Sequence, residues 1–294
     1  MNAMIFKKMS ELTAEDMVAL WNKGFEGYYI NSELNLDKFL SRAVNEGLSL
    51  EHSLVMFAED EPIGFVMNGF RSIEGRKVAW NGGTGIVPAY RGKGFGKQLM
   101  ERNLQLYREQ GVETALLEAL VQNEAAIHLY RSVGYEITEQ LICLERTDVL
   151  EASLQASENA GRYAVHRGHP AVVKGIPFYR PMSAWQTQWA SMKGGESIII
   201  TEKEEVVGYA LCKRVYGEDG HLATTVLYQC ESIPGHENEG DILKAALCEV
   251  FAPFDSSCKR LAMNLRQANR DLNKLLEEWG FTSFVEQLHM SRRI

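Results

Sequence analysis

The sequence repeats itself with a shift of 146 residues. The segment VPAYRGKGFGKQLM begins at Val87 and aligns without gaps with IPGHENEGDILKAA, which begins at Ile233. The same shift aligns NEAAIHLYRSVGY, from Asn123, with NRDLNKLLEEWGF, from Asn269. Self-similarity at one fixed spacing is the signature of a repeated structural unit. The chain is therefore predicted to contain two copies of one domain.

The domain boundaries follow from length and composition. At 294 residues the chain is long for one domain and sufficient for two. We predict a first domain over residues 1–147, a polar linker rich in Ala and Ser over residues 148–162, and a second domain over residues 163–294. Early in the second copy, loops rather than regular elements are predicted by three prolines: Pro170, Pro177 and Pro181.

The first copy has the pattern of alternating strands and helices. A short strand at residues 4–9 precedes two helices, the first capped by Thr13 and the second near residues 37–45. Apolar runs on either side of residues 60–62 predict a β-hairpin, and Gly82-Gly83 predicts a bulge in the strand that follows. The pattern indicates a mixed α/β domain, which continues with a helix over residues 94–110, a strand over 113–121, a helix over 123–133 and a strand over 135–146.

Composition argues against several classes of function. A net charge of −8 disfavours nucleic acid as a partner, because phosphate backbones require a concentrated basic face. The sequence has no signal-peptide pattern and no run of about 18 apolar residues, so we expect no membrane association. The five cysteines form no C-x-x-C pair, which predicts reduced thiols, a cytoplasmic location and no metal site.

A glycine-rich basic stretch follows the strand with the predicted bulge. RGKGFGK, residues 91–97, alternates cations with Gly92, Gly94 and Gly96. Glycines let successive backbone N–H groups converge, and at a helix N-terminus these donors attract an anion such as a pyrophosphate. A P-loop needs four residues between its first glycine and Gly-Lys, and a dinucleotide fingerprint needs G-x-G-x-x-G. The stretch fits neither pattern.

Together the two repeated segments resemble the GNAT superfamily of N-acetyltransferases. Arg91, Gly94 and Gly96 fill the family's [RQ]-x-x-G-x-[GA] loop, and NEAAIHLYRSVGY resembles its N-x-x-A-x-x-L-Y-x-x-x-G-[FY] element at every fixed place. The resemblance covers the first copy well and the second copy in outline. It implies two domains, each with a central, mostly antiparallel, twisted sheet flanked by helices. It also implies that the first domain binds acetyl-CoA as a cosubstrate, without a metal.

The resemblance assigns the cofactor contacts residue by residue. The pyrophosphate would lie on the glycine-rich loop, and the pantetheine arm would pair with the backbone of Ile86 and Val87. Asn123 would bond the CoA arm, cap the following helix, or do both. The expected cofactor-binding residues are Ile86, Val87, Arg91, Gly92, Lys93, Gly94, Phe95, Gly96, Lys97, Asn123 and Tyr130.

Two residues are predicted to carry the chemistry. Acetyl transfer requires removal of a proton from the amine and delivery of a proton to the departing thiolate. Tyr130 occupies the position of the family's general acid, and the alternative is an aromatic residue packed in the core. Glu118, in LLEALVQN, resembles the glutamate that accepts the amine proton in the branch that acetylates protein N-termini. The alternative base is a water relay lined by Asn81 or Thr84.

The acceptor pocket is predicted from the first two helices and the segment between them. That segment combines aromatic residues with carboxylates, which suit a cationic amine and equally suit a helix core with a solvated rim. The expected substrate residues are Tyr28, Tyr29 and Asn81. We expect a primary amine as the acceptor, and small metabolites, antibiotics, polyamines and peptide N-termini are all open.

The second copy lacks the features that would hold the cofactor. The shift replaces Gly96 by Ile242 and Tyr130 by Leu276. A pyrophosphate would be repelled by the carboxylates that the shift brings to the loop: Glu237, Glu239 and Asp241. We predict a GNAT-like domain that does not bind CoA and that shields the first domain's sheet or forms a wall of the acceptor pocket. The chain would be a monomer whose copies form an intramolecular pseudo-dimer.

The leading hypothesis is an acetyl-CoA-dependent N-acetyltransferase in which the amine attacks directly within a ternary complex. A non-catalytic acyl-CoA-binding or sensor protein is the alternative from another class. A further alternative is an acyltransferase that uses a different, larger acyl-CoA. The combination of Tyr130 and Glu118 favours the enzyme.

Overall fold

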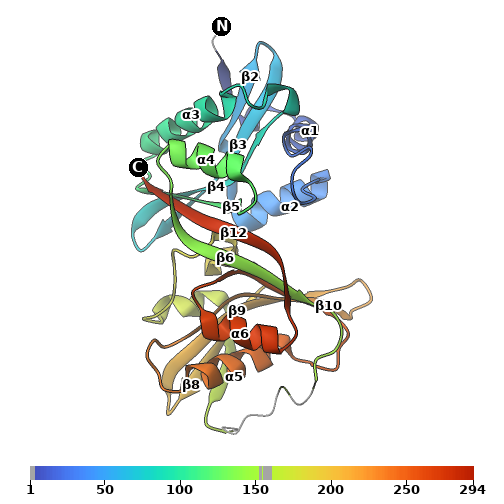
Figure 1. Cartoon of the computed structure of the whole chain (residues 1–294), viewed down its shortest axis with the longest axis vertical. Coiled ribbons are helices and arrows are strands. Elements are labelled where there is room, and N and C mark those ends of the chain that lie inside the picture. The colour runs from blue at the N-terminus through green and yellow to red at the C-terminus, as the bar shows by residue number, and fades with distance from the viewer. Residues whose placement is uncertain (1–3, 152–153, 155–160) are drawn as a thin grey trace. The chain divides into compact units, whose positions relative to one another are not determined.

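The computed structural model describes residues 4–151, 154 and 161–294. The chain forms two compact units: residues 1–138 with residues 288–294 form the first, and residues 139–287 form the second. This division differs from the predicted boundary because strands β6 (Glu136–Arg146) and β12 (Thr282–Arg293) each begin in one unit and end in the other (Figure 1). Most of the predicted linker over residues 148–162 lies outside the described residues.

The first unit is a sheet with helices on both faces. The sheet runs β1-β2-β3-β4-β5, followed by the end of β12 and the start of β6. The pairs β1–β2, β2–β3 and β3–β4 are antiparallel, and the pair β4–β5 is parallel. The elements are β1 (Ile5–Lys8), α1 (Ala14–Gly24), α2 (Leu36–Glu46), β2 (Leu48–Ala58), β3 (Glu61–Ile73), β4 (Arg76–Ile86), α3 (Phe95–Glu109), β5 (Thr114–Leu120) and α4 (Glu124–Ser132).

Local sequence signals set the ends of the first two helices. Thr13 caps α1 by accepting a hydrogen bond from the N–H of Asp16, as predicted. Asn35 caps α2 in the same way through the N–H of Lys38. Gly47 ends α2 with a φ of 69°, a left-handed conformation that favours glycine.

The alternation of side chains along the strands divides the core of the first unit into two layers. One layer lies against α1 and α2 and includes Trp21, Phe39 and Phe65. The other lies against α3 and α4, which Figure 1 shows on the opposite side of this sheet, and it includes Tyr107. The second layer also contains two residues of the C-terminal strand, Leu288 and Met290.

The second unit repeats this plan without the first two α-helices. Strand β10 (Leu222–Ser232) and helix α6 (Arg270–Glu278) lie 146 residues after β4 and α4, which confirms the predicted duplication. Where the first unit has α1 and α2, the proline-rich segment forms short 3-10 turns and loops, as predicted. The sheet runs from the start of β12 through β6, β11, β10, β9 and β8 to β7. The remaining elements are β7 (Ala164–Gly168), η4 (Pro170–Gly175), η5 (Trp185–Thr187), η6 (Trp189–Ser191), β8 (Glu196–Glu202), β9 (Glu205–Tyr216), α5 (Glu239–Phe251) and β11 (Lys259–Arg266).

Candidate functional site

Strands β4 and β5 separate part-way along their length. Their parallel pairing joins residues 78–81 of β4 to residues 114–117 of β5. Beyond these positions β4 continues to Ile86 and β5 to Leu120, and within the described residues no further pairing joins the two strands. The edges of both strands therefore face a gap, where an extended ligand can bond to the backbone like an added strand.

A β-bulge marks the point where the strands separate. Met67 and Asn68 are adjacent on β3, but their opposite residues on β4, Gly83 and Asn81, are not adjacent. Gly82 is therefore the extra residue of the bulge, which bends β4 locally. The structure confirms the bulge that the Gly82-Gly83 pair predicts.

Tyr130, on α4, is buried in the core layer between the sheet and helices α3 and α4, beside the gap between β4 and β5. Its hydroxyl forms hydrogen bonds with the side chains of Thr84 and Asn81, which lie on the bulged part of β4. Burial raises the pKa of Tyr130 to about 12, and the two hydrogen bonds oppose the rise. The phenol is therefore protonated at neutral pH, which is the state that a general acid requires.

The segment between α1 and α2 brings Tyr28 to the same place. The Tyr28 hydroxyl lies within hydrogen-bonding reach of the Asn123 side chain and near Tyr130. Burial raises the pKa of Tyr28, and the bond to Asn123 opposes the rise. Tyr29 packs edge-on against Tyr28 but is 56% exposed. Of the predicted substrate residues, Tyr28 and Asn81 thus meet at Tyr130, whereas Tyr29 lies at the surface.

The other aromatic residues of this segment belong to the core. The rings of Trp21 and Phe25 both pack against Phe65, and Trp21 Nε1 donates a 2.8 Å hydrogen bond to the carbonyl of Ser32. Trp21 and Phe25 therefore pack in a helix core, as the alternative prediction had it, and do not line an acceptor pocket.

Glu118 lies on β5, one residue beyond the last position that pairs with β4. Its side chain is 5% exposed. Trp80 Nε1 donates a 2.7 Å hydrogen bond to Glu118 Oε2, and His289 Nδ1 lies 3.0 Å from Oε1. The carboxylate is therefore withdrawn from water and held at both oxygens. Sequence reasoning missed Trp80 and His289, since nothing near them in the chain marks them as neighbours of Glu118.

The glycine-rich stretch leads from β4 into α3. Gly92 and Gly94 have φ angles of 72° and 83°, in the left-handed region that favours glycine. Gly94 is the N-cap of α3, so the N–H groups of Phe95 and Gly96 have no acceptor within the helix. These donors and the positive end of the helix dipole form a suitable place for an anion.

The side chain of Arg91 is used within the protein. It donates hydrogen bonds of 2.8 and 3.0 Å to the carbonyls of Ile86 and Gly24, and so ties the loop to the ends of β4 and α1. Lys93 is exposed, with its Nζ 5.6 Å from the centre of the Tyr90 ring. The exposed positive charge near the loop is therefore that of lysine, whereas the side chain of Arg91 holds the loop in place.

Two other residues predicted to contact the cofactor, Val87 and Asn123, already use hydrogen-bonding groups within the protein. The N–H of Val87 donates to the carbonyl of Ile63, and its carbonyl accepts from the N–H of Tyr90. Asn123 caps α4 by accepting a hydrogen bond from the N–H of Ala126, which confirms its capping role. Val87 therefore has no unused backbone donor for an added strand.

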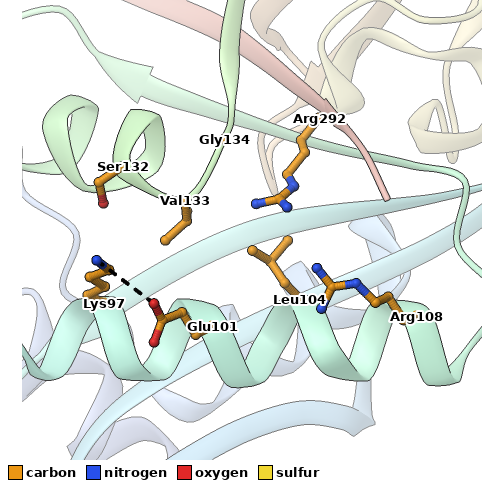
Figure 2. Close-up of a pocket in the computed structure, with 8 residues that line it drawn as sticks. All are labelled: Lys97, Glu101, Leu104, Arg108, Ser132, Val133, Gly134 and Arg292. Atoms are coloured by element: carbon orange, nitrogen blue, oxygen red, sulfur yellow. Dashed lines mark ion pairs between the residues drawn. The ribbon is translucent and has the colours of Figure 1, made fainter.

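A groove of about 410 Å³ lies between α3 and the end of α4 (Figure 2). At one end Lys97, in the first turn of α3, pairs with Glu101 at 4.0 Å. At the other end Figure 2 shows the guanidinium groups of Arg108 and Arg292 near Leu104. The groove is thus mainly cationic along its lining.

The corresponding gap in the second unit is filled by side chains. Strands β10 and β11 pair in parallel over four residues each and then separate, as β4 and β5 do. Arg266 binds both carboxylate oxygens of Glu231, at 3.0 and 2.7 Å. Gln229 donates to the hydroxyl of Ser183 and the carbonyl of Thr187. The cavity left between these residues measures about 10 Å³, which is no more than one water molecule occupies.

The loop before α5 also differs from the loop before α3. Glu239 accepts a 2.7 Å hydrogen bond from the N–H of Gly235, so a carboxylate of the protein already lies at this helix start. Ile242 and Leu276, which replace Gly96 and Tyr130, are completely buried in the core of the second unit.

Within the described part of the chain, no group of three or more His, Cys, Asp or Glu side chains is arranged to hold a metal ion. No helix in residues 4–151, 154 and 161–294 is long and apolar enough to cross a membrane.

Comparison with known proteins identifies the family. The profile of the acetyltransferase (GNAT) family matches residues 7–135. This segment belongs to the GNAT family. The assignment implies an acyl-CoA cosubstrate and an amine acceptor, and it covers less than half of the chain.

Curated relatives match only part of the chain. An uncharacterised N-acetyltransferase of Methanocaldococcus jannaschii is 28% identical over an alignment of 134 residues, and the match covers 42% of this chain and 57% of the relative. The N-alpha-acetyltransferase RimI of Mycobacterium tuberculosis is 44% identical over 52 residues, 18% of this chain and 31% of the relative. The L-amino acid N-acyltransferase MnaT of Escherichia coli is 29% identical over 72 residues, 24% of this chain and 42% of the relative. The chain thus spans at most 57% of these relatives.

Solved structures match the GNAT-like fold of the whole chain. A GCN5-related N-acetyltransferase from Sphaerobacter thermophilus has a TM-score of 0.69 at 15% identity, and the match covers 100% of this chain and 96% of that one. A tandem GNAT protein from the clavulanic acid biosynthesis pathway has a TM-score of 0.60 at 11% identity, covering 99% and 98%. At such identities the likeness shows a shared tandem fold.

Proposed function

We propose that the GNAT half transfers an acetyl group from acetyl-CoA to a primary amine within a ternary complex. The CoA pyrophosphate binds at the N-terminus of α3, and the pantetheine arm lies in the gap between β4 and β5. The amine attacks the thioester carbonyl, Glu118 takes the amine proton, and the thiolate leaves with the proton of Tyr130. The C–N bond forms as the C–S bond breaks, and each proton has a named acceptor.

The observation that carries this proposal is the position of Tyr130. A buried phenol, kept protonated by its surroundings, lies beside two separated strands in the same unit as a helix start suited to an anion. A thioester whose arm fills the gap would bring its sulfur towards this hydroxyl. Such a donor contributes to rate only when a leaving group needs a proton, so the arrangement favours catalysis over simple binding.

The acceptor class follows from the lining of the gap and from the relatives. Tyr28 and Asn81 present polar groups beside Tyr130. RimI is named as an N-alpha-acetyltransferase, and MnaT is named as an N-acyltransferase of L-amino acids. We therefore propose an amino group of an amino acid or a peptide as the first acceptor class to test. A sensor that binds acyl-CoA without turnover, or an enzyme for a larger acyl group, is the alternative.

We further propose that only the GNAT half binds the cofactor. Replacement of Gly94 by alanine should weaken acetyl-CoA binding about tenfold in calorimetric titration, because a non-glycine residue in the left-handed region costs about 1–2 kcal/mol that binding would have to restore. Gly240, its counterpart in the second unit, lies in α5 with no atom within 4 Å of an added Cβ. Gly240→Ala is therefore the matched control and should bind as the unaltered chain does.

The titration also reports stoichiometry. One site per chain that is sensitive to Gly94 and not to Gly240 is the expected result. Two sites would contradict the filled gap between β10 and β11. Absence of binding would overturn the acetyltransferase proposal itself.

A further inference from the structure

A hydrogen-bonded row of side chains crosses three neighbouring strands of the first unit. Trp80 on β4 bonds Glu118 on β5, and Glu118 contacts His289 on β12, with distances of 2.7 and 3.0 Å. The side chains of Glu118 and His289 are only 5% and 4% exposed. Burial of a carboxylate and an imidazole costs free energy unless each satisfies the other. The pair is therefore a built feature of the protein interior.

The period of the strands explains why these side chains meet. Ala79, Leu117 and Met290 all point into the core layer against α3 and α4. The adjacent residues on these strands are Trp80, Glu118 and His289. Because side chains alternate along a strand, they must point to the opposite face of the sheet, where α1 and α2 pack. Glu118 is the first residue of β5 beyond its pairing with β4, so its side chain lies where the two strands begin to separate.

The duplication supplies an internal comparison. The 146-residue shift places Asn264 on Glu118 and Cys143 on His289. These two residues also touch, since Cys143 Sγ lies 3.2 Å from Asn264 Oδ1. Burial raises the pKa of Cys143 to about 11, so the thiol is neutral at physiological pH. The contact is thus kept in both copies, but an ionisable pair is present only in the copy that has the glycine-rich loop.

We propose that His289 is a positioning residue for the carboxylate that deprotonates the amine, so that the last strand of the chain completes the active site of the GNAT half. This inference rests on the proposed role of Glu118. The Nδ1–H of a neutral imidazole donates to Glu118 Oε1 while the indole N–H donates to Oε2. The carboxylate is thereby held in one orientation, with its remaining lone pairs directed by two rigid rings.

Other charged groups near Glu118 make this support necessary. Glu46, at the end of α2, lies close enough to Glu118 for the two carboxylates to repel each other. Burial raises the pKa of Glu46, and the charge of Glu118 raises it further. Arg42 bonds Glu46 at 2.9 Å and opposes the rise, and Arg71 on β3 acts in the same direction. Two buried carboxylates in one region cannot both remain ionised without donors. His289 supplies one of these donors to Glu118.

The test uses the full chain with two replacements of His289. Asparagine can present an amide N–H near the place of Nδ1, whereas leucine fills the space without a donor. In general, loss of one hydrogen bond to a carboxylate moves the titration of that carboxyl group to higher pH by roughly 1 to 2 pH units. His289→Leu should show this shift, His289→Asn should show little of it, and Cys143→Ala should show none.

Two readouts separate this inference from the proposed function. The first is the pH dependence of the Glu118 carboxyl 13C signal in glutamate-labelled protein, assigned by its absence in Glu118→Gln. The second is the acid limb of kcat/KM with a tripeptide that carries a free α-amino group.

Parallel shifts in His289→Leu, restored in His289→Asn, support the proposal. An unshifted carboxyl signal, or a shifted signal with an unshifted acid limb, would overturn it. If the unaltered chain acetylates neither the tripeptide nor any free amino acid, the proposed function fails, and with it the role of His289 in catalysis, whatever the carboxyl titration shows.

Discussion

Replacement of Tyr130 by phenylalanine should lower kcat by about 10²- to 10⁴-fold, the usual contribution of a positioned general acid. Phenylalanine keeps the ring in the core, and Thr84 and Asn81 remain bonded to each other at 2.7 Å. The affinity for acetyl-CoA should therefore be unchanged in calorimetric titration. A fall in kcat without a change in affinity identifies loss of transition-state stabilisation.

Tyr135→Phe is the matched control for this replacement. The Tyr135 ring lies 6.1 Å from the Tyr130 ring in the same core layer, and its buried hydroxyl has no hydrogen-bond partner among the described residues. Removal of an unsatisfied buried hydroxyl should leave kcat unchanged and stability equal or slightly higher. Comparable turnover in the Tyr130→Phe variant and the unaltered chain would exclude Tyr130 as the acid and favour a sensor.

Removal of residues 288–294 should abolish cooperative folding of the first unit. Leu288 and Met290 are buried in its core, and truncation of such side chains to alanine costs about 2–5 kcal/mol each. The combined loss approaches the whole stability of a domain, about 5–15 kcal/mol. The deletion also exposes the edge of β5, which favours aggregation. Denaturant unfolding followed by circular dichroism and size-exclusion chromatography measures both effects.

Single replacements in the same strand separate core packing from the deletion as such. Met290→Ala should lower the free energy of unfolding by about 2–5 kcal/mol. Phe284 is 43% exposed, so Phe284→Ala should have a much smaller effect. A fragment of residues 1–147 that unfolds cooperatively, at the same denaturant concentration as the full chain, would contradict the assignment of residues 288–294 to the first unit.

The local elements of the fold were predictable because their causes lie close together in the chain. Thr13 precedes the helix that it caps, and the Gly82-Gly83 pair lies at the bulge that it forms. The duplication was visible because the glycine that ends α4 and its aromatic neighbour recur 146 residues later as Gly280 and Phe281. Positive φ angles of 85° and 78° at Gly134 and Gly280 explain why both copies kept these glycines.

The long-range parts of the site could not be read from the sequence. The motif predicts Tyr130, and the resemblance predicts Tyr28 as a substrate residue, but neither predicts that Tyr28 lies near Asn123. Arg91 fits the motif, yet its side chain bonds two carbonyls, a role that depends on where α1 ends. His289 lies 171 residues from Glu118, and its role depends on which strand lies next to β5. Pattern and period fix which face a side chain occupies, and they do not fix which strand is its neighbour.

The passage of β6 and β12 from one unit into the other has a consequence for biosynthesis. A first domain usually folds while the remainder of a chain is being translated, at about 5–20 residues per second. Here β12, which supplies residues 288–294 to the first unit, follows the whole of the second unit in chain order. During translation the edge of β5 therefore stays uncovered until β12 has been synthesised. The first unit can therefore acquire His289 and complete its core only after the second unit has been translated.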